Sequence, residues 1–282
     1  MIAVAYSGSH QADWRLATAN KTIASFKTNG INPQFNDEKS ILQLLNKNIN
    51  LIHHAEEVKK LYFFSAGISR KDLKDLLVKA FGKFFKNAKV YIGQDMQAAA
   101  VACCKNNAGI ICICGSGTNA GWYDGKKLKP NNYGLGYILA DEGSANWLGR
   151  QLIKAFMNET LPAQLRQKFE HRYEADRKTI LEKVYRQKQP ALFLSSFTDF
   201  YVDNLSDPFL QNKVLEGFNL LTETYLLPLK QQNNSDTVHF TGSIASLFPN
   251  ELRQAAEKAG IEVGTVLREP INNLLTYYIT KN

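Results

Sequence analysis

The sequence lacks long hydrophobic segments. No run of about 18 apolar residues occurs among its 282 residues, so we expect no membrane-spanning helix. No basic segment precedes the apolar start at 1–5, which therefore predicts a first strand in a cytoplasmic protein and not a signal peptide. Although the net charge is +8, basic and aromatic residues are not interleaved in one run, which argues against nucleic-acid binding. A modest positive charge suits small anions such as nucleotides.

Cysteine is also scarce. There are four cysteines, and no histidine lies near them at a spacing typical of a metal site. Cys112 and Cys114 share one face of a predicted strand, while Cys103 and Cys104 lie in a predicted helix. We therefore expect reduced thiols in the core, without disulfides or a metal centre.

Composition and pattern predict a folded α/β protein. Hydrophobic residues make up 44% of the chain and charged residues 21%, which argues against disorder, and the length favours two domains. The pattern predicts three strands, then a helix, strand, helix, strand and helix, and the second half restarts with strands. The predicted strands are 2–6, 14–18, 22–27, 61–64, 90–92, 110–114, 120–123, 134–139, 238–240 and 261–266. The predicted helical regions are 41–52, 69–81, one that starts at 95, about 142–229, 244–259 and 271–279.

Two turns repeat along the chain. The segment 7–14 aligns in register with 115–122, and alanine and tryptophan coincide in both. Together with the repeated element order, this match predicts two copies of one domain that face each other. The expected domains are 1–107, to which the last helix at 271–282 returns, and 108–270, with the helical insertion at about 142–229. The alternative is one mixed domain decorated with helices.

The same turns are candidate phosphate sites. Gly and Ser allow a phosphate to approach the backbone closely, and backbone N–H groups can point at the anion. The candidates are Ser7, Gly8, Ser9 and His10 in the first turn, and Gly115, Ser116, Gly117 and Thr118 in the second. Ordinary hairpin turns have similar sequences, so this alternative stays open.

Carboxylates follow two of the predicted strands. Asp95 is either a helix N-cap or a base that accepts a sugar hydroxyl proton. Asp141 and Glu142 follow the predicted strand at 134–139, and they are either hydroxyl-binding acids or part of a helix N-terminus. Asn32, in the irregular loop 28–33, could add an amide to a polyol site.

Several motifs occur together in one order. They are IGQDMQAA at 92–99, CGSGTN at 114–119, YGLG at 133–136, ADEGS at 140–144, WLG at 147–149 and FTGSIA at 240–245. In this order they resemble the N-acetylglucosamine kinase family, which is grouped with the BadF/BadG/BcrA/BcrD ATPases in the actin and hexokinase superfamily. The motifs extend over nearly the whole chain.

The resemblance implies a fold, ligands and roles. The implied fold is two ribonuclease H-like, actin-like ATPase domains with an inter-domain cleft, and the implied ligands are a sugar, ATP and Mg²⁺. Asp95 would be the catalytic base. Asn32, Gly67, Asn119 and Asp141 would hold the sugar. The two turns would hold the phosphates, and Gly242 and Ser243 would lie beside adenine and ribose.

The first turn departs from the family pattern. The family has a carboxylate where this chain has Tyr6, and a hydroxyl and a lysine where it has His10 and Gln11. Ala140 also replaces a glycine, which is a milder change. A neutral phenol supplies no anionic ligand to a metal shell, and losing one preorganised group of this kind typically costs about 3 kcal/mol, or roughly a hundredfold in rate. We therefore expect sugar binding to survive better than turnover.

The sequence predicts an ATP-dependent kinase of N-acetylglucosamine or a related hexose, slowed by Tyr6, with small molecules as its partners. One alternative is a sugar-binding regulatory protein that has lost phosphoryl transfer. Another is a BadF-type activator with a cysteine-ligated iron–sulfur cluster at a dimer interface. Whether the chain forms a homodimer is left open by the sequence.

Overall fold

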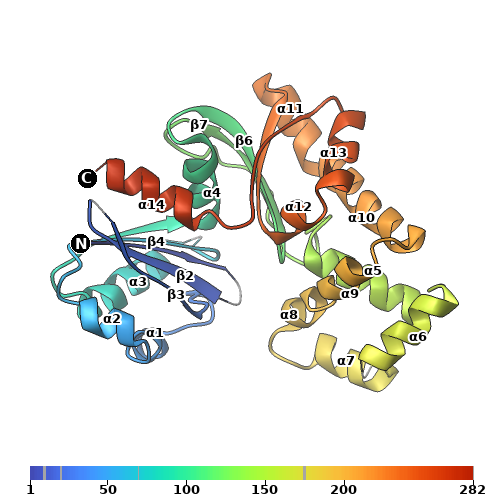
Figure 1. The fold of residues 1–282 in the computed structure, drawn as a ribbon, viewed down its shortest axis with the longest axis horizontal. Coiled ribbons are helices and arrows are strands. Elements are labelled where there is room, and N and C mark those ends of the chain that lie inside the picture. Colours follow the sequence, from blue (N-terminus) through green and yellow to red (C-terminus); the bar gives the residue numbers. More distant parts are fainter. Residues whose placement is uncertain (9–10, 20, 69, 174–175, 282) are drawn as a thin grey trace. The chain divides into compact units, whose positions relative to one another are not determined.

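The computed structural model describes every residue except 9–10, 20, 69, 174–175 and 282. The chain forms two compact units, and each contains a β-sheet with helices packed on it (Figure 1). Unit 1 comprises Met1–Asn107, Gly125–Leu128 and Glu269–Asn282, and unit 2 comprises Ala108–Asp124 and Lys129–Arg268. No helix in the described part of the chain is long and apolar enough to span a membrane.

Unit 1 is built on a mixed sheet with the strand order β3-β2-β1-β4-β5. Its strands are β1 (Ile2–Ser7), β2 (Gln11–Ala17), β3 (Thr22–Asn29), β4 (Lys60–Ser65) and β5 (Lys89–Gln94). β2 runs antiparallel to β1 and β3, whereas β1, β4 and β5 run parallel. The carboxyl ends of β1, β4 and β5 therefore meet at one edge of the sheet.

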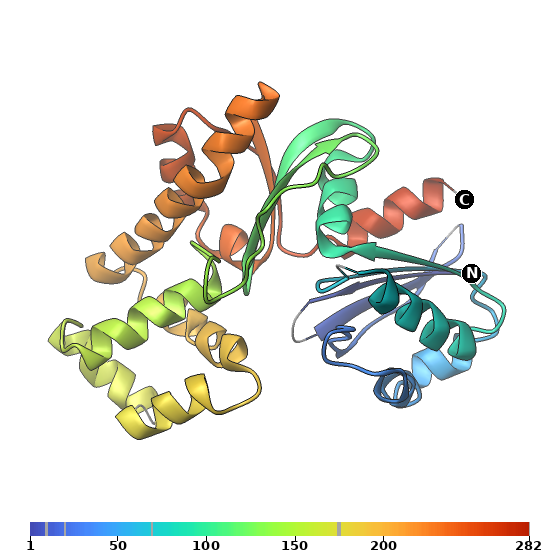
Figure 2. The ribbon, with the colours of Figure 1, turned by 180° about the vertical axis from the view of Figure 1, so that it is seen from behind.

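Helices cover both faces of this sheet (Figures 1 and 2). They are α1 (Glu38–Leu45), α2 (Ile49–His54), α3 (Lys71–Phe84), α4 (Asp95–Cys104) and α14 (Ile271–Thr280). One face packs its core on α1–α3 around the fully buried Trp14, whose ring lies 6.2 Å from the rings of Phe63 and Phe81. α4 and α14 pack on β1 and on each other, so the end of the chain completes unit 1.

Unit 2 has a smaller sheet, with the order β7-β6-β8-β9, and a larger set of helices. Its strands are β6 (Ala108–Cys114), β7 (Thr118–Asp124), β8 (Thr237–Thr241) and β9 (Glu262–Leu267). Its helices are α5 (Ala145–Met157), α6 (Ala163–Arg172), α7 (Arg177–Tyr185), α8 (Pro190–Ser195), α9 (Thr198–Asp203), α10 (Pro208–Leu221), a π-helical turn (Thr222–Leu226), α11 (Leu227–Asn233), α12 (Ser243–Leu247) and α13 (Pro249–Lys258). The predicted helical region thus begins at Ala145, where Ser144 Oγ caps the helix by accepting the Trp147 N–H at 3.2 Å.

The two sheets confirm the prediction of a duplicated α/β fold. The strand series β2-β1-β4-β5 in unit 1 and β7-β6-β8-β9 in unit 2 have the same order and the same relative directions. Each begins with an antiparallel hairpin, and the two aligned turns connect the corresponding strands. β3 is an addition in unit 1.

The predicted strand at 134–139 is wrong, because this segment is irregular. Gly134 and Gly136 adopt positive φ values of 77° and 81°, which no strand accommodates. The apolar residues of the segment are consequently not in the core. Leu135, Ile138 and Leu139 are 60%, 70% and 74% exposed.

Two helix predictions also need correction. The predicted helix 244–259 is divided into α12 and α13 at Pro249, because proline lacks the N–H that a continuous helix needs. The predicted cap at 69–72 is not observed as such. Ser69 lies outside the described residues, and Arg70 occupies the N-cap position of α3 without a side-chain cap bond.

Candidate active site

The turn between β1 and β2 is held by hydrogen bonds within unit 1. The Gly8 N–H donates to Gln11 O at 2.9 Å. Ser7 is fully buried, and its hydroxyl accepts the Ile31 N–H at 2.8 Å and donates to Gly8 O at 3.3 Å. Ser7 and Gly8, which were predicted to hold phosphate, thus form hydrogen bonds within unit 1. Ser9 and His10, predicted for the same role, lie outside the described residues.

The loop that carries Asn32 is fixed from both sides. Ser7 binds the Ile31 N–H, and Ser65 Oγ donates to Ile31 O at 2.8 Å. Asn32 Oδ1 accepts the Gln34 N–H at 2.9 Å, and any side chain at Gly67 would clash with the Asn32 amide. The structure therefore brings together Asn32 and Gly67, both predicted sugar residues. Ser65, at the end of β4, was missed because one serine carries no distinctive pattern.

Tyr6 lies near two carboxylates, those of Asp13 and Asp95. It pairs directly with Asp13 across the β1–β2 ladder, so the two side chains lie on the same face of the sheet. Burial raises the pKa of the Tyr6 phenol, and the charges of Asp95 and Asp13 raise it further. Tyr6 is therefore a neutral phenol at physiological pH and supplies no anionic ligand.

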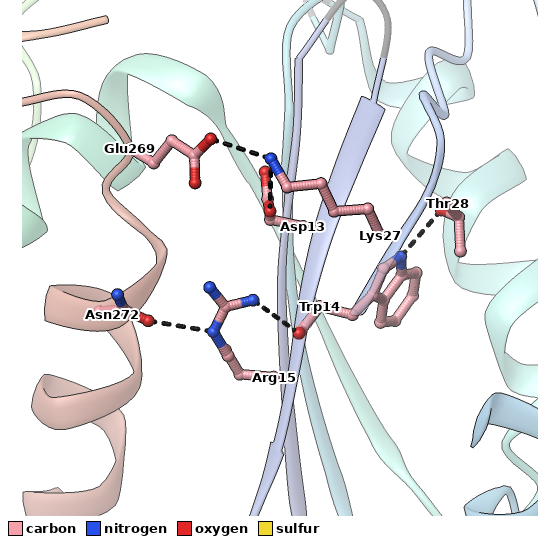
Figure 3. Close-up of polar contacts among 7 residues, drawn as sticks. All are labelled: Asp13, Trp14, Arg15, Lys27, Thr28, Glu269 and Asn272. Carbon is pink, nitrogen blue, oxygen red and sulfur yellow. Dashed lines mark hydrogen bonds and ion pairs between the residues drawn. The ribbon is translucent and has the colours of Figure 1, made fainter. Parts of the chain in front are cut away.

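Asp13 is engaged by a cation (Figure 3). Lys27 Nζ lies 3.4 Å from Asp13 Oδ1 and 3.0 Å from Glu269 Oε1, and Arg15 Nε donates to Asn272 Oδ1 at 3.0 Å. Burial raises the pKa of Asp13, Glu269 adds to this effect and Lys27 opposes it. These contacts bind the C-terminal segment to β2 and β3. They also mean that Asp13 is already neutralised and does not simply replace the carboxylate missing at Tyr6.

Asp95 stands where β5 passes into α4. Gln94 occupies the N-cap position without a side-chain cap bond, whereas Asp95 Oδ1 accepts the N–H of the adjacent Met96 at 2.8 Å. Asp95 is half-buried, and burial raises the pKa of its carboxyl, while the Met96 N–H opposes the rise. Gln94 is thus the N-cap, and Asp95 is an acidic residue in the first turn of α4. A raised pKa suits a group that must accept a proton near neutral pH.

The turn between β6 and β7 is bound to the start of α5. The Ala145 N–H donates to Gly115 O at 2.9 Å and the Asn146 N–H to Ser116 O at 3.2 Å. The Gly115 N–H closes the turn on Gly117 O at 3.0 Å. Thr118 Oγ1 donates to Glu142 O at 2.8 Å. The predicted second phosphate turn and the predicted sugar acids are therefore one hydrogen-bonded assembly.

Asp141 is the centre of this assembly. Its Oδ1 accepts the Thr118 N–H at 2.9 Å, and its Oδ2 accepts Asn146 Nδ2 at 2.7 Å. Burial raises the pKa of the Asp141 carboxyl, while these hydrogen bonds and the charge of Arg150 oppose the rise. A Cβ at Gly117 would lie 2.8 Å from Asp141 Oδ2, so the turn can approach the carboxylate only because position 117 is glycine.

Replacing Asp141 by alanine should lower the free energy of unfolding by about 2–3 kcal/mol. The change leaves two buried donors without partners, and it places alanine at a φ of 67°, which disfavours residues other than Gly, Asn and Asp. Urea unfolding measures the difference. Asp75→Ala, on the exposed face of α3, is the control and should change stability by less than about 0.5 kcal/mol. Equal stability losses in the two variants would contradict the role of Asp141.

Asn119 and Gly134 also meet. Asn119 lies on β7, and a Cβ at Gly134 would be 2.8 Å from its Nδ2. Asn119 Oδ1 is buried and accepts no hydrogen bond from the described residues. An amide oxygen without a protein partner is a suitable acceptor for a ligand hydroxyl.

Gly242 and Ser243 lie beside the second turn. A Cβ at Gly115 would be 3.8 Å from Gly242 Cα and 3.8 Å from the Ser243 nitrogen. Gly242 has a φ of 114°, and a side chain there would clash with Cys114 O. The structure thus brings together all of the residues of unit 2 that the sequence predicts for the nucleotide.

Two polar residues of α5 were missed. Asn146 binds Asp141, and Arg150, four residues later on the same helix face, donates from Nη2 to Ala140 O at 3.2 Å. This spacing directly after the paired acids is the signal that could have identified them. In addition, the Tyr225 hydroxyl hydrogen bonds to Glu142, which ties the segment before α5 to the π-helical turn.

The residues present do not form a dedicated magnesium site. Among the described residues no group of three His, Cys, Asp or Glu side chains could hold a metal ion. Tyr6 offers a neutral phenol, and Asp13 is paired with Lys27. Mg²⁺ usually binds through one or two carboxylates together with substrate phosphates. We therefore treat MgATP as a substrate and assign no protein residue to its metal.

Comparisons with known proteins identify structural relatives. No protein-family model matches the chain, and neither does any curated protein. A solved structure from Porphyromonas gingivalis, described as a "putative N-acetylglucosamine kinase", is 31% identical, with a TM-score of 0.93 over 99% of both chains. Two others share the fold at 13% identity. One, from Chromobacterium violaceum, has the same description and a TM-score of 0.70 over 98% of this chain and 99% of that one. The other is a ROK-family glucokinase from Streptomyces griseus in complex with glucose and AMPPNP, with a TM-score of 0.56 over 99% and 98%.

The sequence identity to the P. gingivalis protein, over nearly the whole chain, is high enough to assign the family. The other two structures match this chain in fold. The same chain carries the motifs of that family in order. The chain belongs to the N-acetylglucosamine kinase family, with the two-domain actin-like ATPase fold of sugar kinases.

Proposed function

We propose that this protein is an ATP-dependent sugar kinase whose catalytic base is Asp95. The observation that carries the proposal is the Asp95 carboxylate. It stands at the carboxyl end of β5, it is not used as the N-cap of α4, and burial raises its pKa. Membership of the family makes a sugar hydroxyl the expected source of the proton.

In the proposed reaction the sugar hydroxyl oxygen attacks the γ-phosphorus of ATP. The bond between that phosphorus and the bridging oxygen of ADP breaks, and ADP leaves with the bonding electrons. The hydroxyl proton passes to Asp95. Phosphoryl transfer of this kind depends mainly on positioning and on neutralising the charge of the phosphates.

The remaining roles are proposed for the residues of each unit separately. In unit 1, Asn32 beside Gly67 would bind sugar hydroxyls. In unit 2, the unpartnered Oδ1 of Asn119 and the Asp141 assembly would bind further hydroxyls. The turn at 115–118 with Gly242 and Ser243 would hold the nucleotide. N-acetylglucosamine is the sugar that we propose, because two of the relatives are described as putative kinases of this sugar.

The test is sugar-dependent release of ADP by the purified chain. N-acetylglucosamine should give the highest kcat/KM, followed by glucosamine, at a slow kcat because of Tyr6. Mass spectrometry should detect one phosphate added to the sugar. Absence of sugar-dependent ADP release, with both ligands bound, would contradict kinase activity.

A second candidate is a sugar-binding regulatory protein of the same fold. The specific observation in its favour is Tyr6, a neutral phenol with a raised pKa where the family has a carboxylate. Calorimetry separates the two candidates. A kinase should bind both N-acetylglucosamine and MgATP, whereas a sensor that has lost phosphoryl transfer should bind the sugar without MgATP.

A further inference from the structure

Unit 2 contains an open groove between α5 and α7, which we call the α5–α7 groove. Its volume is about 630 Å³, within the size range of small-molecule sites. α5 and its C-cap Asn158 contribute residues at positions 150, 153, 154, 157 and 158, and α7 contributes residues at 177, 180, 181, 184 and 185. This spacing presents one face of each helix over about 12 Å, because a helix rises 1.5 Å per residue.

The wall of the groove is apolar. Ile153, Ile180 and Leu194 form its floor and belong to the hydrophobic core of unit 2. Above them, apolar side chains reach solvent, with Leu181 38% and Tyr185 79% exposed. Exposed apolar surface gathered in a concavity is typical of a binding site, whereas single exposed apolar residues are ordinary.

The polar residues of the groove are mainly cations. Arg150, Lys154 and Arg177 line it, and no described acidic residue does. None of the three is in an ion pair within the described part of the chain. Arg150 also acts on the Asp141 carboxyl, so Lys154 and Arg177 are the cations available to a ligand. An apolar wall with these positive charges complements a ligand that has an apolar body and a negative group.

Other occupants fit less well. A sugar requires carboxylate or amide acceptors, which are sparse here, and a metal ion requires acidic or histidine ligands. An isologous contact with a second copy would bring these three cations toward the same cations of that copy, which is unfavourable. The groove is also distinct from the residues assigned above to the sugar and the nucleotide, although Arg150 contacts Ala140 O.

We propose that the α5–α7 groove binds a fatty-acid anion, with its hydrocarbon chain on Ile153, Ile180 and Leu194 and its carboxylate on the surrounding cations. The proposal stands whether or not the chain transfers phosphate, because it concerns different residues. A chain that loses two methylene groups should bind about 15-fold more weakly, from the transfer free energy of methylene.

The experiment is isothermal titration calorimetry of the full chain with dodecanoate below its micelle concentration. We expect one site per chain, weaker binding of decanoate by about 15-fold, and little binding of dodecyltrimethylammonium, which has the same chain and the opposite charge. Arg177→Glu should weaken dodecanoate binding by about tenfold. Lys178→Glu is the matched control, because it makes the same charge change at the next exposed position outside the groove, and it should leave binding unchanged.

A second variant, Leu181→Glu, tests the apolar wall and should also reduce binding, with thermal unfolding used to verify that it is folded. Equal binding of the cationic and anionic amphiphiles would overturn the proposal, as would equal effects of Arg177→Glu and Lys178→Glu. Self-association that Leu181→Glu disrupts, without dodecanoate binding, would assign the groove to a second copy and would also overturn it.

Discussion

Asp95→Asn should lower kcat for phosphorylation of N-acetylglucosamine by about 10²- to 10⁴-fold, the usual contribution of a general base. Asparagine keeps the shape of the side chain and its bond to the Met96 N–H, but it cannot accept the hydroxyl proton. The sugar should still bind, because its other contacts are unchanged. The measurement is steady-state ADP release together with calorimetric binding of the sugar.

The pH dependence of the wild type provides an independent check. Only the ionised carboxylate is a base, and burial raises the pKa of Asp95. Activity should therefore fall with decreasing pH at a higher pH than an ordinary aspartate would produce, and this limb should be absent from Asp95→Asn. Asp75→Asn, on the exposed face of α3, should keep both the rate and the pH profile. Full activity in Asp95→Asn would exclude Asp95 as the base.

Tyr6→Asp should raise kcat by roughly a hundredfold, because it supplies an anionic group where the resemblance to the family implies a carboxylate. The charges of Asp95 and Asp13 already raise the pKa of the Tyr6 phenol. A carboxylate at this position adds a negative charge near Asp95 and Asp13, so without nucleotide the variant should be less stable than the wild type. Mg²⁺ and nucleotide should restore its thermal midpoint more than they raise that of the wild type.

Tyr6→Phe is the matched control. It removes only the hydroxyl and adds no charge, so neither kcat nor the Mg²⁺ dependence of the thermal midpoint should increase. A rate for Tyr6→Asp that equals that of Tyr6→Phe would show that the missing carboxylate does not limit turnover. The thermal measurement separates this outcome from a failure of the variant to fold.

The roles of Asp95 and Asp141 illustrate different limits of the sequence. Asp95 follows a short apolar strand and opens a helix, and that local pattern was sufficient to single it out. The structure places Gln94 at the N-cap position and Asp95 in the first turn of α4, and its role as the base stays a prediction. Asp141 was predicted as a hydroxyl-binding acid, but its bonds to Thr118 and Asn146 connect residues that are 23 and 5 positions away. No local pattern specifies such a network.

The segment at 134–139 shows why composition can mislead. Its apolar residues favour a buried strand, but the positive φ values of Gly134 and Gly136 prevent extended geometry and leave these residues at the surface. The α5–α7 groove was not predicted either. The apolar spacing of each helix is equally consistent with complete burial, and only the structure shows that one face of each helix lines a groove.

The sequence by itself determined the duplicated order of strands, the two small-residue turns, the motifs of the family and the presence of a phenol at Tyr6. These features are local, because strand periodicity, turn chemistry and residue identity depend on neighbouring positions. Only the tertiary structure decided that Lys27 forms an ion pair with Asp13 and that Asp141 joins the second turn to α5. It also decided that a groove with apolar walls and cationic side chains lies between α5 and α7. Each of these depends on contacts between residues brought together by folding, and on how burial changes the free energy of a charge.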